Sequence, residues 1–325
     1  MVIVSAGAVL AYWDPAGQLA LLAWWLAWQT LTGLYLAVTL ILITAAAVES
    51  IGLGKRACSY HHVGGCSTQQ QGSLGPGIGQ WITVYDEHPR KPLNQRCHEH
   101  VTNTALKQLN EQANKAGLMV SSVAGCHGLW TFIMDAGTGF TEQMCVLGNP
   151  FNSKSLPEYF LPDEWIQYYQ VRGFMITAVA GSTGACSLVV MSKGTPYTDQ
   201  TYKVSKSFPI KWISNNCTIG WYITSMAYFQ GKWVIVMSKN AGFVDQYVEL
   251  DFQHPSEGYL KWATGGLGYQ ITAVAATPKK NAAVLSIPRQ QATHNLQDIK
   301  TSLQFPSASI NKQYIAGIAY GRTVS

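Results

Sequence analysis

Basic residues recur at one position of a repeated phrase, and this recurrence suggests that the protein binds anions. Lys193 and Lys239 each follow a Val-Met-Ser phrase, and three further basic residues stand in or near the corresponding turns of two other segments. The five residues are Lys193, Lys239, Arg289, Arg90 and Lys91. Gathered on one face, they would attract an acidic peptide, a phosphopeptide or an anionic lipid headgroup. An ordinary solvated rim is the alternative, and Asp135 in another copy weakens the basic character.

The side-chain amide of glutamine is the second recurring group. Gln143, Gln200 and Gln246 each stand nine residues after a methionine, and Gln95 follows the strand-like segment Trp81–Tyr85 by ten residues. Because this amide both donates and accepts hydrogen bonds, each glutamine can satisfy the backbone of a hairpin. The other interpretation is a ring of identical polar groups that faces a ligand.

Three tryptophans of the repeats, Trp130, Trp212 and Trp233, are interpreted as core residues. If they instead lined a deep pocket, the protein would bind a small molecule or a sugar. The sequence leaves both interpretations open.

Motifs for other chemistry are missing from the sequence. The Cys/His groups within 58–66 and 97–100 lack the paired spacing of structural zinc sites, and the glycine-rich run 72–79 lacks the Lys-Ser/Thr of a phosphate loop. We therefore predict no metal, no cofactor and no catalytic residue. A net charge of only +5, without an aromatic and basic platform, argues against nucleic-acid binding. A hydrophobic share of 47% and a charged share of 12% exclude a disordered chain.

The elements that carry these residues repeat along the chain. An Ile-Thr-Ala-Val-Ala phrase or a variant of it begins at residues 120, 176, 223, 271 and 315, and a second apolar phrase follows the first four copies. Short β-rich runs joined by glycine-containing turns are typical of antiparallel sheets. Such units share a core when they stack radially, so the sequence predicts a mainly β fold, a β-propeller-like ring of about five repeats. An irregular β-rich α+β repeat domain or an open solenoid is the alternative.

Both ends of the repeat region are predicted to complete one unit of the ring. The fifth copy stops after its first strand, and residues 81–100 supply the strands that it lacks, which leaves no exposed sheet edge. The other units take their third strand, such as 201–204 or 247–251, from the residues after their own hairpin. A helix is expected within 103–115. The five units are expected at 81–100 with 313–325, 117–166, 173–213, 220–263 and 268–310.

The N-terminal part has a different character. Residues 19–48 form an uncharged run that is long enough to cross a bilayer as a helix. Trp24, Trp25 and Trp28 lie near one end of this run, where aromatic side chains suit the membrane–water interface. We predict an N-terminal segment 1–50 with a transmembrane helix at about 19–43, a Gly/Gln-rich linker at 51–79 and a repeat domain at 80–325. Lys55 and Arg56 place that domain in the cytoplasm or an organelle interior. If the apolar start is a wrongly assigned coding sequence, the protein is instead soluble in the nucleus or cytoplasm.

Residues 80–325 resemble the C-terminal accessory domain of plant and green-algal casein-kinase-I-like serine/threonine protein kinases. The resemblance rests on Met134–Phe140, Val190–Tyr197, Val248–Phe252 and the ending Tyr320–Ser325, with little insertion or deletion between them. It implies shared ancestry of an accessory domain, with a role in kinase targeting or partner binding.

The kinase domain of those relatives has no counterpart here. Residues 1–80 are too few for one, and the sequence lacks a kinase Gly-rich loop, strand lysine, His-Arg-Asp loop and Asp-Phe-Gly motif, which phosphoryl transfer requires. We therefore expect a non-enzymatic, membrane-tethered interaction or scaffold domain with an unidentified protein or acidic peptide partner. The alternatives are a kinase fragment whose catalytic domain is missing from this chain, and a small-ligand-binding propeller.

Overall fold

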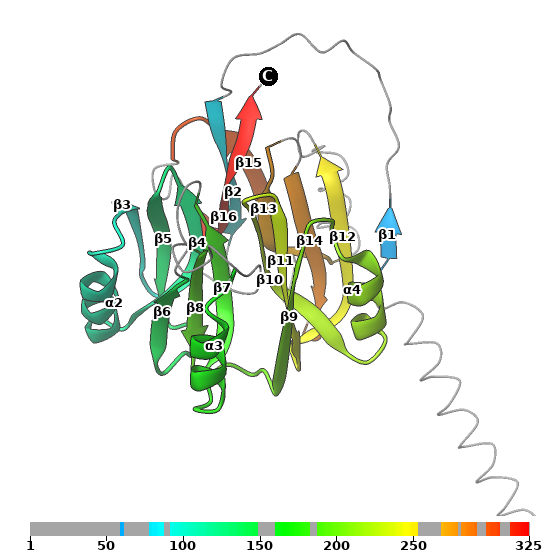
Figure 1. Ribbon diagram of the computed structural model, residues 1–325, viewed down its shortest axis with the longest axis horizontal. Coiled ribbons are helices and arrows are strands. Elements are labelled where there is room, and N and C mark those ends of the chain that lie inside the picture. The colour runs from blue at the N-terminus through cyan, green and yellow to red at the C-terminus, as the bar shows by residue number, and fades with distance from the viewer. Residues whose placement is uncertain are drawn as a thin grey trace, which may run out of the picture. The chain divides into compact units, whose positions relative to one another are not determined.

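The computed structural model describes residues 59–61, 78–87, 92–148, 160–182, 187–252, 268–278, 281–290, 297–305 and 313–324, which belong to one unit, Arg56–Ser325 (Figure 1). The described strands are β1 (Ser59–His61), β2 (Ile78–Glu87), β3 (Gln95–Val101), β4 (Leu118–Cys126), β5 (Leu129–Ala136), β6 (Gln143–Leu147), β7 (Met175–Gly181), β8 (Ser187–Ser192), β9 (Asp199–Ser205), β10 (Trp221–Phe229), β11 (Lys232–Lys239), β12 (Phe243–Phe252), β13 (Gln270–Ala276), β14 (Asn281–Pro288), β15 (Gln297–Ser302) and β16 (Gln313–Val324). The described helices are α2 (Leu106–Lys115), α3 (Asp163–Gln170) and α4 (Ile210–Cys217). None of these helices is long and apolar enough to span a bilayer, and the predicted transmembrane segment at 19–43 lies outside the described residues.

The described strands form five antiparallel sheets, each with an inner, a middle and an outer strand. In that order the sheets are β4-β5-β3, β7-β8-β6, β10-β11-β9, β13-β14-β12 and β16-β2-β15. Strand β1 adds a short parallel strand at the outer side of β12. The mainly β fold predicted from the sequence is therefore confirmed.

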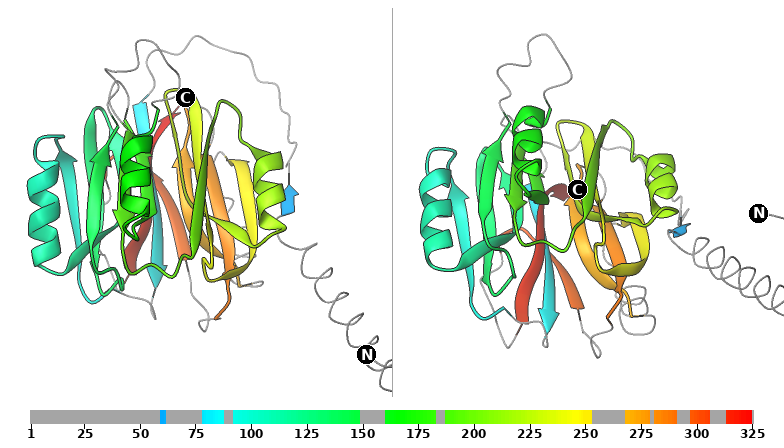
Figure 2. Two further views of the ribbon diagram at one scale, coloured as in Figure 1. Left: turned by 60° about the horizontal axis from the view of Figure 1, so that its bottom comes forward. Right: turned by 90° about the horizontal axis from the view of Figure 1, so that it is seen from below.

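The inner strands contact one another in a circle. β4 contacts β7, β7 contacts β10, β10 contacts β13, β13 contacts β16, and β16 contacts β4 again. Among the described residues no hydrogen-bonded ladder joins one sheet to the next, so the sheets surround a centre without forming a closed barrel. In both views of Figure 2 the three described helices lie on the outside of the sheets.

One sheet is built from both ends of the repeat region. In its antiparallel ladder, Ile82 pairs with Ala319 and Tyr85 pairs with Ile315. Figure 1 shows the red strand β16 beside the blue-cyan strand β2. The predicted pairing of residues 81–85 with 315–319 is therefore confirmed.

The predicted boundaries of the units are wrong by one strand. Strand β9, which contains residues 201–204, pairs with β11 of the following hairpin and not with β8 of the preceding one. Likewise β3, expected beside β2, pairs with β5, and β15 occupies the place beside β2. Each sheet thus takes its outer strand from the segment before its own hairpin. This exchange links each sheet covalently to the sheet before it.

Each described helix leads into an inner strand through a glycine. Gly117, Gly173 and Gly220 follow α2, α3 and α4 and have φ values of +69°, +83° and +83°. This left-handed conformation costs glycine little and ends the helix, so that the chain turns directly into the strand. The predicted helix within 103–115 is confirmed as α2.

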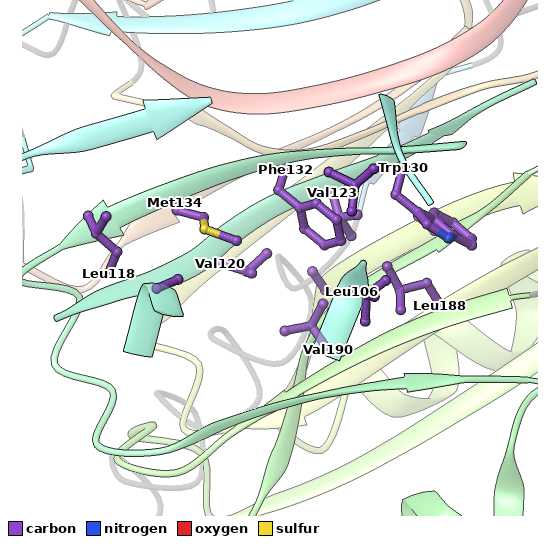
Figure 3. Packing of buried hydrophobic residues seen from close by; sticks show 13 residues of the cluster. Leu106, Leu118, Val120, Val123, Trp130, Phe132, Met134, Leu188 and Val190 are labelled. Carbon is purple, nitrogen blue, oxygen red and sulfur yellow. The ribbon is translucent and has the colours of Figure 1, made fainter. Parts of the chain in front are cut away.

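Hydrophobic clusters fill the space between neighbouring sheets, one cluster for each of the five junctions in the described unit. At the junction between the sheets of β5 and β8, Trp130 and Phe132 pack in one cluster with Leu188 and Val190 (Figure 3). Because side chains alternate along a strand, Ile133, the residue after Phe132, points to the opposite face and packs in the cluster of Trp81. Every sheet is therefore covered on both faces by its two neighbours.

Candidate functional site

Gln200 on the outer strand β9 joins two neighbouring sheets. Its Oε1 accepts a hydrogen bond from the backbone N–H of Ile176 at 2.6 Å, and its Nε2 donates to the carbonyl of Ile176 at 2.8 Å. Ile176 lies on β7 of the preceding sheet. The same Nε2 also donates to Ser238 Oγ of its own sheet, at 2.9 Å. Both amide hydrogens and the amide oxygen are thus engaged within the protein.

The same glutamine bridge occurs at all five junctions of the described unit. The pairs are Gln143 with Val120, Gln200 with Ile176, Gln246 with Ile223, Gln297 with Ile271 and Gln95 with Ile315. Each partner residue directly precedes a β-bulge, where the ladder shifts register. A bulge disrupts the ladder, so nearby backbone groups need other partners. The glutamines therefore lie in the arrangement of the first interpretation, bonded to backbone, and not directed at a ligand.

A pair of hydroxyl groups extends three of these bridges. Ser238 Oγ accepts from Gln200 and lies 2.8 Å from Thr224 Oγ1. Ser238 is fully buried, and either hydroxyl of this pair can donate the hydrogen bond between them. Two further sheets repeat this pair, as Ser192 with Thr177 and Ser286 with Thr272.

Two sheets carry an aspartate where the other three carry this serine. Gln95 donates to Asp135, and Gln297 donates to Asp86. Burial raises the pKa of the Asp135 carboxyl above its usual value, although hydrogen bonds from Ser121 and Gln95 oppose the shift. These aspartates lie in the sheet built from both ends of the repeat region and in its neighbour, so ring closure involves buried carboxyl groups.

A small cavity lies at the centre of the described unit. Its volume is about 90 Å³, and five consecutive residues from each inner strand line it. This is far below the roughly 300 Å³ or more of a typical ligand pocket, although it is enough for a few water molecules. Trp130, Trp212 and Trp233 are not among its lining residues: Trp130 is fully buried, and the other two pack at the edge of a core cluster. This cavity is therefore not the tryptophan-lined pocket on which a small-ligand function would depend.

Lys193 and Lys239 occupy equivalent turns, as predicted from the repeat, but each has an acidic partner. Lys193 Nζ lies 2.8 Å from Glu142, and Lys239 Nζ lies 3.8 Å from Asp199. The same ammonium groups lie over the rings of Phe174 and Trp221. Glu142 directly precedes the outer strand β6 and Asp199 begins the outer strand β9, and the two carboxylates offset the positive charge that the lysines bring.

Of the other three predicted basic residues, the structure describes only Arg289. When the sheets are aligned on Ser192, Ser238 and their equivalents, Ile287 takes the place of Lys193 and exposed Arg289 lies two residues further on. Arg90 and Lys91 lie outside the described residues. The described part of the chain therefore contains two ion-paired lysines at this position, where the sequence suggested a larger basic group.

Cys97 and His98 from one of the Cys/His groups are neighbours on β3, so their side chains point to opposite faces. Burial raises the pKa of the Cys97 thiol to about 11 and lowers the pKa of His98. Cys97 packs against a core cluster beside Trp81. No group of three or more His, Cys, Asp or Glu side chains that could hold a metal ion occurs in the described ranges.

Five antiparallel sheets, arranged in a circle and bridged by a recurring glutamine, define a mainly β repeat protein. The chain belongs to the family described as "Domain of unknown function (DUF7477)", whose model matches residues 54–325. The match begins within the segment that the sequence suggested to be a linker, and it includes β1.

A rice protein, "Casein kinase 1-like protein HD16" of Oryza sativa subsp. japonica, is 45% identical to this chain over 256 residues. The similarity covers 77% of this chain and 34% of the rice protein, so the chain corresponds to about a third of that relative. The resemblance to casein-kinase-I-like proteins is therefore confirmed, and the matched family is a domain of unknown function and not a kinase domain.

Proposed function

We propose that this chain is a non-catalytic protein-interaction module related to the accessory region of casein kinase 1-like proteins. The observation that carries the proposal is the family match over residues 54–325, in a chain whose rice relative is about three times as long as the matched part. The circle of inner strands and the five glutamine bridges favour a β-propeller. A propeller exposes the loops of all its repeats on two faces, which provides a broad surface for a partner.

The chemistry of the described interior favours binding over catalysis. A catalytic thiol is normally activated by a lowered pKa or an adjacent base. Burial instead raises the pKa of Cys97 to about 11 and that of Cys145 to about 12. The bridging glutamines are engaged with backbone, so they support the fold and not a reaction.

We include a membrane tether in the proposal. It is supported by the uncharged run 19–48 and by Lys55 and Arg56 after it, which would leave the repeat unit on the cytoplasmic or organelle-interior side. A tethered protein stays in the membrane pellet after carbonate extraction. Recovery of the full chain in the soluble fraction would contradict this part of the proposal.

The interaction function is tested by comparing the proteins that bind this chain with those that bind the matched region of the rice relative. Deletion of the matched region from that relative should remove a defined subset of its bound proteins, and the present full chain should capture the same proteins. Incubation of the full chain with ATP and casein should transfer no phosphate above the protein-free control. An unchanged set of bound proteins, or sustained transfer, would contradict the proposal.

The length of the rice relative favours a second candidate, in which this chain is one part of a longer kinase polypeptide. Because the similarity covers only 34% of the rice protein, this chain would then be the accessory region of a longer kinase polypeptide. Transcript sequencing across the codons for residues 70–85 separates the two candidates. A transcript that continues upstream into kinase-coding sequence supports the second, and one that continues into the apolar segment supports the first.

A further inference from the structure

We propose that the exposed face of helix α3 is a docking surface for an arginine-containing segment of a protein partner. This inference rests on the proposed interaction function and adds the place and the chemistry of the contact. Trp165 is 53% exposed and Tyr168 is 46% exposed, although large aromatic side chains are usually mostly buried. Their rings lie 5.8 Å apart, and Tyr169 stacks on Trp165 with a centroid distance of 6.1 Å. The three aromatic side chains form one surface on the outside of the circle of sheets.

The repeat provides an internal comparison for Trp165. Helices α3 and α4 both follow a proline N-cap, and each has a tryptophan as its third residue, Trp165 or Trp212. Lys203 Nζ of β9 lies over the ring of Trp212 at 5.8 Å. Counted from the bridging glutamine of each outer strand, the equivalent of Lys203 is Val146 on β6. The α3 repeat therefore lacks the lysine that covers the tryptophan of α4.

Coverage of an aromatic ring by a cation is a general feature of the described unit. The pairs are Arg172 with Tyr168, Lys193 with Phe174, Lys203 with Trp212, Lys232 with Phe160, Lys239 with Trp221 and Lys300 with Tyr85. Indole binds cations more strongly than the other aromatic rings. Within the described ranges no cation lies over Trp165, the more exposed of the two exposed aromatic side chains. The surface thus has room for a cation supplied by a partner.

The charge beside Trp165 selects a basic partner. Asp163 and Glu164 precede Trp165 in α3, whereas Ile210 and Lys211 hold these positions in α4. Asp163 accepts a hydrogen bond from Tyr202, and Glu164 is exposed one turn before Tyr168.

Arginine fits this arrangement better than lysine. A guanidinium group can stack on an indole and also bond a carboxylate through two N–H groups, whereas an ammonium group offers only a point charge. Arg172, whose guanidinium carbon lies 3.5 Å from the ring centroid of Tyr168, shows that this helix already accommodates such a stack. The docking surface therefore consists of Glu164 and Trp165, beside the existing stack of Arg172 on Tyr168.

Binding of a fluorescent hexa-arginine peptide to the full chain, measured by anisotropy at low salt, tests the proposal. We expect saturable binding that weakens at least tenfold in Trp165→Ala and in Glu164→Lys. Hexa-lysine should bind more weakly, and the uncharged isostere hexa-citrulline should not bind. Ile219→Ala is the matched control, because it also removes an exposed apolar side chain, 65% accessible, and should leave binding unchanged. Unaltered thermal unfolding of each variant shows that the fold is retained, as expected for exposed positions.

Several outcomes overturn the proposal. They are an absence of saturable hexa-arginine binding, equal affinity of Trp165→Ala and the unmodified chain, and binding of hexa-citrulline as tight as that of hexa-arginine. A lower oligomeric state of Trp165→Ala in sedimentation velocity also overturns it, because the surface would then contact a second copy of the chain. If Trp165→Ala still captures the proteins of the rice relative, this surface is wrong while the interaction function stands. If the unmodified chain captures none of them, the function itself fails.

Discussion

Gln95 bonds both backbone groups of Ile315, which is 220 positions away in the sequence. Its Nε2 donates to the carbonyl of Ile315 at 2.9 Å, and its Oε1 accepts from the N–H of Ile315 at 2.9 Å. This contact joins the sheet built from both ends of the repeat region to the sheet of β3. The junction between the last and the first repeat thus has the same chemistry as the other four junctions of the described unit.

Replacement of Gln200 by alanine should destabilise the protein. It leaves the N–H and carbonyl of Ile176 without their side-chain partner, and each buried unsatisfied group costs about 1–3 kcal/mol, so we expect a loss of about 2 kcal/mol or more. Urea unfolding measures the change. Gln112→Ala on the exposed face of α2 is the control and should cost little. An equal effect of both substitutions would show that the bridge contributes nothing.

Replacement of Thr83 by valine should stabilise the protein. Thr83 is 1% exposed and its hydroxyl has no hydrogen-bond partner among the described residues, whereas equivalent middle strands carry Phe132, Val189, Ile235 and Ala283. Valine keeps the shape and removes the desolvation penalty, so we expect a gain of about 1 kcal/mol in the free energy of unfolding. Thr177→Val is the contrast and should destabilise, because that hydroxyl is bonded to Ser192. A loss of stability in Thr83→Val contradicts the prediction.

Two glycines of the inner strands should respond oppositely to alanine. A Cβ on Gly181 would overlap the ring of Phe229, so Gly181→Ala forces the ring to move and should cost about 1–3 kcal/mol. A Cβ on Gly317 meets its nearest atoms at 3.8 Å, so Gly317→Ala should be neutral or stabilise by about 0.5 kcal/mol through the unfolded chain. Thermal unfolding of the two variants checks the order. Equal melting temperatures would contradict the close packing of β7 against Phe229.

The buried carboxyl of Asp135 should make stability depend on pH. Burial raises its pKa in the folded protein, so the folded state holds the proton more tightly than the unfolded chain, whose reference pKa is 3.8. The contribution of this group to stability is therefore greatest below that pH and falls as the pH rises through the folded-state pKa. In Asp135→Ser, which has the serine of three other sheets, this loss should disappear. Urea unfolding at a series of pH values measures the free energy of unfolding of both proteins. If the two free energies change with pH in parallel, the prediction is contradicted.

The repeated phrases predicted the inner and middle strands well, because apolar β-rich runs of fixed spacing depend only on local sequence. They did not predict which hairpin each outer strand joins. A strand such as β9 can pair with the free edge of β8 before it or of β11 after it, and only packing in three dimensions selects β11. The unit boundaries from sequence were therefore displaced by one strand, although the pairing of the two ends of the repeat region was correct.

The candidate residues show the same limit. The spacing from methionine led to three bridging glutamines, but Gln297 was missed because its hairpin carries Leu285-Ser286 and is followed by a longer connection. Alignment on the buried serine or aspartate of the middle strand would have found it. The positions of Lys193 and Lys239 were predicted, whereas their partners come from preceding segments of the chain, Glu142 directly before β6 and Asp199 at the start of β9. The exposure of Trp165 depends on what packs over it, which sequence spacing does not reveal.

Amide hydrogen exchange of β16 tests the central claim, the closure of the ring by both ends of the repeat region. If β16 pairs with β2 and its Ile315 is bridged by Gln95, its amides open only with the whole unit and exchange with the same free energy as those of β8 and β11. Exchange of β16 several orders of magnitude faster than that of β8 and β11 would show that the C-terminal strand frays independently, and closure would then be wrong.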